Sequence, residues 1–310
     1  MSAKKKTTDN SRTSKLREER ANIINKKTDF FVRESYNTLR TNVAFALTGD
    51  SPSKVVVVTS GGPSEGKSIT SVNLAISLAE ADKRVILVDC DLRRPKLNRL
   101  LNMSAKNGLS NLLLDVDKFA DTIRPYRENV HVILSGSIPP NPSELLGSSR
   151  MKRLLQVLRE HYDYIILDTP PINMVSDALV LAPVIDGVLL VVRSNHTDRN
   201  GVTAAVDQLN YVQAKILGFV LNGVNLEKSG YGYGKYRYRK YGYGKYGFRK
   251  YGYKKYGYGG YGGYGGYGGY GGYGGYGYGY GYGGYGYGYG YNPSAPAPTE
   301  GNAPGSDSAE

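Results

Sequence analysis

The sequence predicts an α/β fold in which a mainly parallel β-sheet is flanked by helices and followed by a disordered tail rich in Tyr and Gly. Short β-branched segments alternate with helical segments as far as about residue 227, which is the pattern of a parallel sheet covered on both faces. A glycine-rich loop joins the first strand to the next helix. Beyond residue 228 Tyr and Gly dominate, and without aliphatic side chains this part has nothing to build a core from.

Strands are predicted where β-branched and other aliphatic residues run together, as they do in strands buried on both faces. Such segments occur over residues 54–59, 84–89, 129–134, 162–168, 187–193 and 215–221. Helical spacing precedes or separates them over 31–47, 69–81, 143–161 and 198–212. The first helix would place Phe31, Leu39, Val43 and Leu47 on one face, and Ser143 would be the N-cap of the third.

Composition divides the chain into four parts. Residues 1–30 form a flexible basic N-terminus, 31–227 the globular domain, 228–291 the Tyr/Gly-rich tail, and 292–310 a Pro- and Ser-rich acidic end. The net charge is +13, and the basic residues gather in the two flexible parts, with ten Lys or Arg and no acidic residue between 228 and 255. Such segments attract phosphate, anionic lipid or nucleic acid, or simply keep an aromatic tail soluble.

The single cysteine, Cys90, excludes an internal disulfide framework and fits a reducing compartment. The basic N-terminus is not followed by the apolar stretch of a signal peptide. The longest apolar segments are far shorter than the ~20 residues that cross a bilayer. We therefore expect a cytoplasmic protein that meets a membrane only through charge or a partner.

The most specific motif is Gly-Gly-Pro-Ser-Glu-Gly-Lys-Ser at residues 61–68, which matches the phosphate-binding pattern G-x-x-x-x-G-K-[ST]. It lies between a predicted strand and a predicted helix, where backbone N–H groups form an anion nest at a helix N-terminus. Lys67 would reach the β- and γ-phosphates of ATP, and the Ser68 hydroxyl would bind Mg²⁺. The residues expected to contact the nucleotide are Gly61, Gly62, Pro63, Ser64, Glu65, Gly66, Lys67, Ser68 and Ile69.

Aspartates follow two other predicted strands. Asp168 ends the fourth strand, where a P-loop fold places a carboxylate for Mg²⁺. Asp89 ends the second strand, and Asp91 lies two residues further on. This pair exceeds what a plain ATPase needs, and it would supply a second metal ligand and a base for a substrate hydroxyl. Expected metal ligands are therefore Ser68, Asp89 and Asp168, and either Asp89 or Asp91 is the base.

The segment from Glu34 to Leu221 resembles the bacterial tyrosine kinases, in particular the cytoplasmic kinases of capsular polysaccharide synthesis. The similar features are the P-loop, the box Val-Asp-Cys-Asp-Leu-Arg at 88–93, the box Asp-Thr-Pro-Pro at 168–171 and a Tyr-rich C-terminus. The segments at 139–146 and 177–193 are also similar. The resemblance implies an ATP-dependent protein-tyrosine kinase whose catalytic and Mg-ATP residues are Lys67, Ser68, Asp89, Asp91 and Asp168, with Asn222 near the nucleotide base.

The same resemblance implies several partners. They are a membrane-embedded activator of the polysaccharide co-polymerase type, protein tyrosine substrates and a cognate tyrosine phosphatase, which would place the kinase at the inner face of the membrane. Family members pack into rings through Glu-x-x-Arg-x-x-Arg on the first helix. Here Glu34 and Arg40 fit that pattern, but Asn37 replaces the middle Arg and removes an ion pair, so we expect a weakened ring. The other interpretation is an ordinary solvated helix face.

An alternative function is that of the cell-division and partition ATPases, which are similar in fold and would use the tail only as an interaction surface. They carry an extra Lys early in the loop, at the position that Gly62 occupies here. This difference favours the kinase.

The tail holds 24 of the 29 tyrosines, between Tyr231 and Tyr291. With a kinase domain on the same chain, the first expectation is that they are phosphoacceptors. Interleaved basic and aromatic residues also bind single-stranded nucleic acid, and Tyr/Gly repeats self-associate. The candidate acceptors are Tyr231, Tyr233, Tyr236, Tyr238, Tyr241, Tyr243, Tyr246, Tyr251, Tyr253, Tyr256 and Tyr258.

Overall fold

The computed structural model describes residues 14, 16–47, 49, 51–114 and 119–224. The acidic end and the candidate phosphoacceptor tyrosines lie outside these residues, as do residues 1–13 and 15 of the basic N-terminus. The predictions made for them therefore remain predictions.

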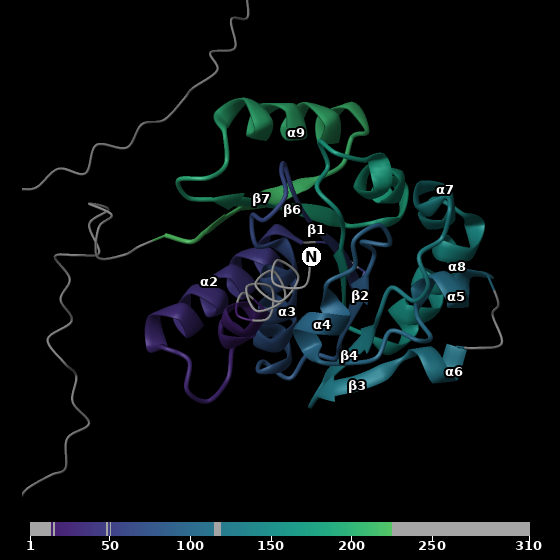
Figure 1. Ribbon diagram of the computed structural model, residues 1–310, viewed down its shortest axis with the longest axis horizontal. Helices are drawn as coiled ribbons and strands as arrows, with labels where there is room; N and C mark the ends of the chain where they lie inside the picture. The colour runs from purple at the N-terminus through teal and green to yellow at the C-terminus, as the bar shows by residue number, and fades with distance from the viewer. Residues whose placement is uncertain (1–13, 15, 48, 50, 115–118, 225–310) are drawn as a thin grey trace, which may run out of the picture. The chain divides into compact units, whose positions relative to one another are not determined.

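The described part is built on one seven-stranded sheet with the order β3-β4-β2-β5-β1-β6-β7 (Figure 1). All neighbouring strands are parallel except β3 and β4, which confirms the predicted fold class. The strands are β1 (Lys54–Ser60), β2 (Val85–Asp89), β3 (Arg124–Arg127), β4 (Val130–Ile133), β5 (Tyr164–Asp168), β6 (Gly187–Arg193) and β7 (Ile216–Asn222).

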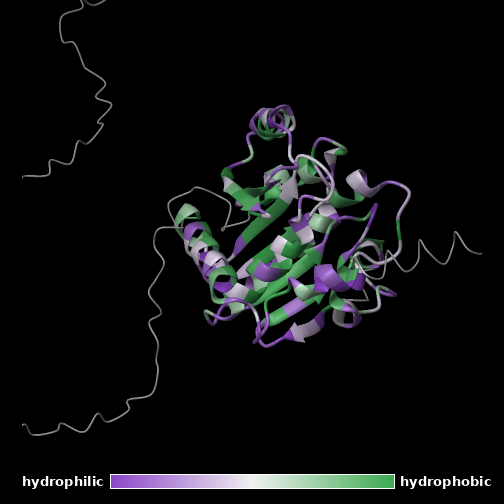
Figure 2. Cartoon of the chain, turned by 60° about the vertical axis from the view of Figure 1, so that its left-hand side comes forward, coloured by the Kyte–Doolittle hydropathy of each residue, from purple (hydrophilic) through white to green (hydrophobic). Residues whose placement is uncertain are grey.

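The central strands are buried on both faces because their side chains are apolar on both. Every residue of β2 and β5 is buried, as are the last six of β1, and Figure 2 shows the middle of the sheet as mainly hydrophobic. Side chains alternate between two cores, so that Val56 and Val58 face one and Val55 and Val57 the other. Burial on both faces is what makes these strands readable as continuous apolar segments.

Helices cover each face. One core takes side chains from α2 (Phe30–Ala46), α3 (Lys67–Ala79) and α4 (Leu97–Leu101). The other takes them from α5 (Leu109–Leu114), α7 (Pro142–Leu146), α8 (Ser149–His161), the 3₁₀ helix η2 (Ser176–Val184) and α9 (Arg199–Tyr211). A four-residue helix, α6 (Phe119–Thr122), precedes β3. Among the described residues, none of the helices is long and apolar enough to span a bilayer.

Three local predictions were wrong. The helix predicted over 143–161 is two helices, because the chain turns at Gly147 and the Ser148 side chain accepts the Met151 N–H as the N-cap of α8. Ser143 is therefore not the cap but lies inside α7. Phe31 is 54% exposed and does not join the buried face of α2. The predicted helix at 69 begins at Lys67, directly from the glycine-rich loop.

Candidate functional site

The glycine-rich loop lies where the sequence places it, between the end of β1 and the start of α3. Gly66 precedes α3 with a φ of +98°, a left-handed conformation that favours glycine. A Cβ at this position would lie 1.9 Å from Asn222 Nδ2. Asn222 donates a hydrogen bond from that nitrogen to the Glu65 carbonyl, at 2.9 Å. The last residue of β7 thus fixes the loop backbone, and glycine is required where the two meet.

Residues at the end of β6 brace the outer side of the loop. Arg193 donates from Nη1 to the Ser64 carbonyl at 2.9 Å, and His196 Nε2 lies 3.3 Å from the Pro63 carbonyl. The Glu65 carboxylate turns back and accepts the Gly62 N–H at 3.2 Å. Neither Arg193 nor His196 was predicted from the sequence to belong to the site. Arg193 ends β6 and His196 follows it at the carboxyl edge of the sheet, but nothing in the local sequence distinguishes them from other residues at strand ends.

Lys67 extends from the first turn of α3 into a group of carboxylates. Its Nζ lies 3.1 Å from Asp91 Oδ2, and both residues are less than a tenth exposed. Burial alone would lower the pKa of Lys67, but the charges of Asp168, Asp91 and Asp89 outweigh it and raise that pKa. Lys67 is therefore a cation in this site at neutral pH, ready to meet the charge of a phosphate.

Asp89 and Asp168 lie side by side because β2 and β5 pair in that register. Both are fully buried, and burial together with their mutual repulsion raises the pKa of Asp89 well above its ordinary value. Burial also raises the pKa of Asp168, although Lys67 and hydrogen bonds from Ser68 and Ser71 oppose the shift. The predicted residues Lys67, Ser68, Asp89, Asp91 and Asp168 thus come together at the carboxyl end of the sheet.

The donor set fits a divalent cation. Three buried aspartates face one lysine, and Asp89 Oδ2 is buried without a hydrogen-bond partner, which is costly unless a ligand supplies charge. Within the described residues, no group of three or more His, Cys, Asp or Glu could hold a metal ion by itself. Mg²⁺ takes one or two carboxylates and completes its shell with phosphate oxygens and water.

The raised pKa of Asp89 gives a stability prediction for the ligand-free chain. Because the folded state holds this proton more tightly than the unfolded state, Asp89 destabilises the fold progressively as pH rises above about 4. We expect Asp89→Asn to raise the free energy of unfolding by about 1–2 kcal/mol at pH 7, and by less at pH 4. Denaturant titrations at both pH values measure it. A variant that is less stable than wild type at pH 7 would contradict it.

The residues predicted to join subunits make contacts within this chain. Arg40 Nη1 donates to the Ser77 carbonyl on α3 at 2.5 Å, and Asn37 Nδ2 donates to Glu34 Oε1 at 2.8 Å. Asn37 Oδ1 also lies 3.3 Å from the Ser77 hydroxyl. In this chain, therefore, Arg40 and Asn37 attach α2 to α3, and the ring remains a prediction.

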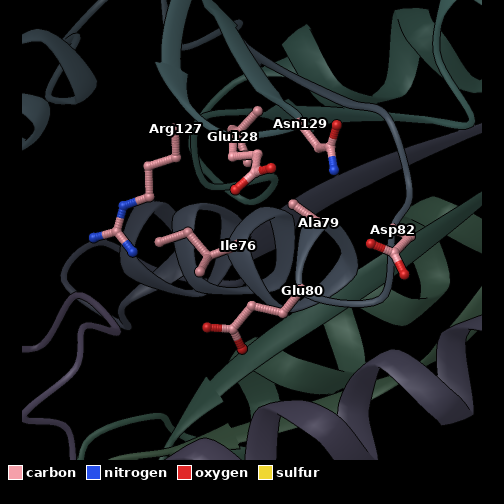
Figure 3. A pocket seen from close by; sticks show the side chains of 8 residues that line it. Ile76, Ala79, Glu80, Asp82, Arg127, Glu128 and Asn129 are labelled. Carbon is pink, nitrogen blue, oxygen red and sulfur yellow. The ribbon is translucent and has the colours of Figure 1, made fainter.

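A hollow of about 320 Å³ lies away from this site, around the C-terminal end of α3 and the turn between β3 and β4 (Figure 3). Its lining includes Ile76, Glu80, Arg127 and Glu128. Since α3 rises about 1.5 Å per residue, this hollow is roughly a whole helix length from Lys67. It is not part of the phosphate site.

The comparisons with known proteins point to one family. A family model described as an AAA domain matches residues 53–220. The chain is 41% identical over 202 residues to the tyrosine-protein kinase YwqD of Bacillus subtilis, with 64% of this chain and 85% of that protein covered. It is 36% identical over 206 residues to the tyrosine-protein kinase CpsD of Streptococcus agalactiae, with 66% and 89% covered.

A solved structure of a tyrosine-kinase domain is also similar to this chain. The kinase domain of the Escherichia coli tyrosine kinase ETK matches with a TM-score of 0.59 and 36% identity, covering 62% of this chain and 76% of that domain. The residues matched by the family model include the glycine-rich loop and all three aspartates of the site.

Proposed function

The chain belongs to the bacterial tyrosine-protein kinases, and from that premise we propose that it transfers the γ-phosphoryl group of Mg-ATP to tyrosines of its own C-terminal tail. The observation that carries the proposal is the convergence of Lys67 with Asp89, Asp91 and Asp168 beside the glycine-rich loop. A phosphate-binding loop alone would serve any nucleotide enzyme, whereas this site also offers carboxylates beyond those needed to hold Mg²⁺.

Each residue of the site has its own proposed role in phosphoryl transfer. The loop amides and Lys67 would bind the phosphates and balance the charge that develops during transfer. Ser68, Asp168 and Asp89 would hold Mg²⁺, which when bound neutralises phosphate charge. The tyrosine oxygen bonds to the γ-phosphorus while the bond to the bridging oxygen breaks, and ADP leaves. Asp89 or Asp91 takes the hydroxyl proton.

The tail is proposed as the acceptor because it supplies 24 tyrosines on the same chain as the site. Each phosphate adds about −1.5 to −2 charges. About six phosphates would therefore cancel the ten positive charges between residues 228 and 255. We propose that this change of sign controls assembly of the kinase or its contact with a partner, and that transfer occurs between subunits.

Regulation is proposed from the family alone. A membrane-embedded activator of the polysaccharide co-polymerase type would hold the kinase at the inner face of the membrane, and a tyrosine phosphatase would reverse the modification. The process regulated would be the synthesis and export of capsular or other extracellular polysaccharide.

Mixing two variants tests transfer between subunits. A full-length Lys67→Ala chain would serve as acceptor, and a chain ending at residue 227 would serve as a kinase without the tail tyrosines. After incubation with Mg-ATP, phosphotyrosine on the Lys67→Ala chain would support the proposal. If wild type modifies itself but the mixture does not react, transfer is within one chain. ATP hydrolysis without phosphotyrosine in any sample would favour an ATPase switch.

A further inference from the structure

Three segments that are distant in the sequence meet in one hydrogen-bonded cluster around the buried Asp177, beside the site. Arg93 binds Asp177 through two parallel bonds, from Nε to Oδ2 and from Nη2 to Oδ1, both 2.9 Å long. The Ser143 hydroxyl donates to Asp177 Oδ1 at 2.6 Å and accepts from Arg93 Nη2 at 2.9 Å. The cluster thus ties the loop after β2 to α7 and to η2.

Asp177 is the buried member of this cluster. The Asp177 side chain is fully buried, whereas the Arg93 side chain is 38% exposed at the edge of the cluster. An ionised carboxylate in the interior requires a paired cation and hydrogen bonds. The planar guanidinium supplies two donors in a fixed geometry, so it defines the position and direction of the chain that carries it.

That chain is the loop that holds Asp91. Asp91 N–H donates to Asp89 Oδ1 at 3.3 Å, and Asp91 Oδ1 accepts the Arg94 N–H at 3.0 Å, while Oδ2 meets Lys67. On one side the loop continues from β2, which pairs with β5. On the other side Arg93 ties it to Asp177, next to Leu92, which is buried in the core. The position of residues 91–94, and with it the contact between Asp91 and Lys67, therefore depends in part on the cluster.

We propose that Arg93, Asp177 and Ser143 are positioning residues for phosphoryl transfer, which hold Asp91 in register with Lys67. The inference rests on the function proposed above. It gives a role to Ser143 and Asp177, which the segments 139–146 and 177–193 supply and which do not contact the glycine-rich loop. A displacement of about 1 Å in a reacting group lowers turnover by up to about 100-fold.

A simpler explanation is that the cluster only stabilises the fold, and the chain offers a matched control for it. Arg159 of α8 pairs with Asp186, which precedes β6, through a bond of 2.8 Å. That pair also joins a helix to the chain beside a strand, but it lies at the opposite end of the sheet from Asp168 and Asp91. Its loss should affect stability without moving the site.

The experiment compares Asp177→Asn and Arg93→Lys with Asp186→Asn and Arg159→Lys in the full-length chain. ADP formation gives kcat and KM for ATP without requiring an acceptor, and thermal unfolding gives stability. We expect kcat to fall about 10- to 100-fold in the first two variants, with KM changed by less than about threefold. The two control variants should keep kcat within about twofold of wild type, even where their unfolding temperature falls as far as that of Asp177→Asn or Arg93→Lys.

Two further measurements cover the case in which a variant folds poorly. Ser143→Ala should lower kcat by several fold and Ser143→Thr, which keeps the hydroxyl, should restore it. Amide exchange of Arg94 should be faster in Asp177→Asn but not in Asp186→Asn. Equal kcat in the two sets, or losses that only follow unfolding temperature, would overturn the inference. Lys67→Ala run in parallel tests the site itself, since its full activity would refute the proposed function instead.

Discussion

Replacing Lys67 with Ala is expected to lower the rate of phosphoryl transfer by about 10³-fold. The lysine is buried, and its Nζ lies 3.1 Å from Asp91 Oδ2. Burial lowers its pKa, but the charges of three aspartates raise that pKa by more, so the lysine is a cation. A preorganised charge in a water-poor site contributes about 10²–10³ in kcat, and it also binds the phosphates of the ground state. Single-turnover transfer from labelled ATP measures the loss.

The same substitution should destabilise the ligand-free fold. A lysine whose folded-state pKa is raised contributes stability that is fully present below its unfolded pKa of about 10.4, hence at pH 7. Its removal leaves three buried carboxylates facing each other, at a cost of order 3 kcal/mol. Lys215→Ala is the control, because Lys215 donates to the Ala46 carbonyl at the other end of β7. Transfer at a normal rate by a folded Lys67→Ala chain would refute the assigned role.

The second large effect is expected for Asp168→Asn. Asp168 is buried beside Ser68 and accepts a bond of 3.2 Å from Ser71, which holds its side chain where we propose that it binds Mg²⁺. The amide has the same shape but lacks the charge. We expect kcat to fall about 10²- to 10³-fold and half-maximal activity to require more Mg²⁺. Activity measured as a function of Mg²⁺ concentration at saturating ATP separates the two changes.

The fold of the Asp168→Asn variant should be intact. Since burial raises the pKa of Asp168, neutralising it removes a penalty at pH 7 and the ligand-free chain should be no less stable than wild type. Asp163→Asn is the matched control, because Asp163 pairs with Arg84 at the far end of the sheet. An Asp168→Asn variant with normal activity and unchanged Mg²⁺ requirement would exclude Asp168 as a metal ligand.

The elements that the sequence predicted well share a physical feature. Strands such as β1 and β5 are buried on both faces, so their apolar segments cannot be mistaken for loops. The edge strand β3 was missed, because Pro125 and alternating exposure give it no such signal. The break at Gly147 was also missed, since helical spacing continues through it, although Gly147 and the N-cap Ser148 mark it locally.

The functional site also contains some residues that the sequence predicts and others that it does not. Lys67, Asp89 and Asp168 are predictable because a loop motif and strand ends place them at one edge of a parallel sheet. Arg193 and His196, which brace the loop, act through carbonyl contacts that no local pattern announces. The cluster of Arg93, Ser143 and Asp177 joins residues more than 30 positions apart, so only the folded arrangement reveals it.

The most direct test of the central claim is the intact mass of the full-length chain after incubation with Mg-ATP, with phosphorylated residues mapped by fragmentation. The site predicts several added phosphates per wild-type chain, located on tyrosines between residues 231 and 291, and none on Lys67→Ala. Wild-type chains that hydrolyse ATP but gain no phosphate on tyrosine would contradict a kinase that modifies its own tail.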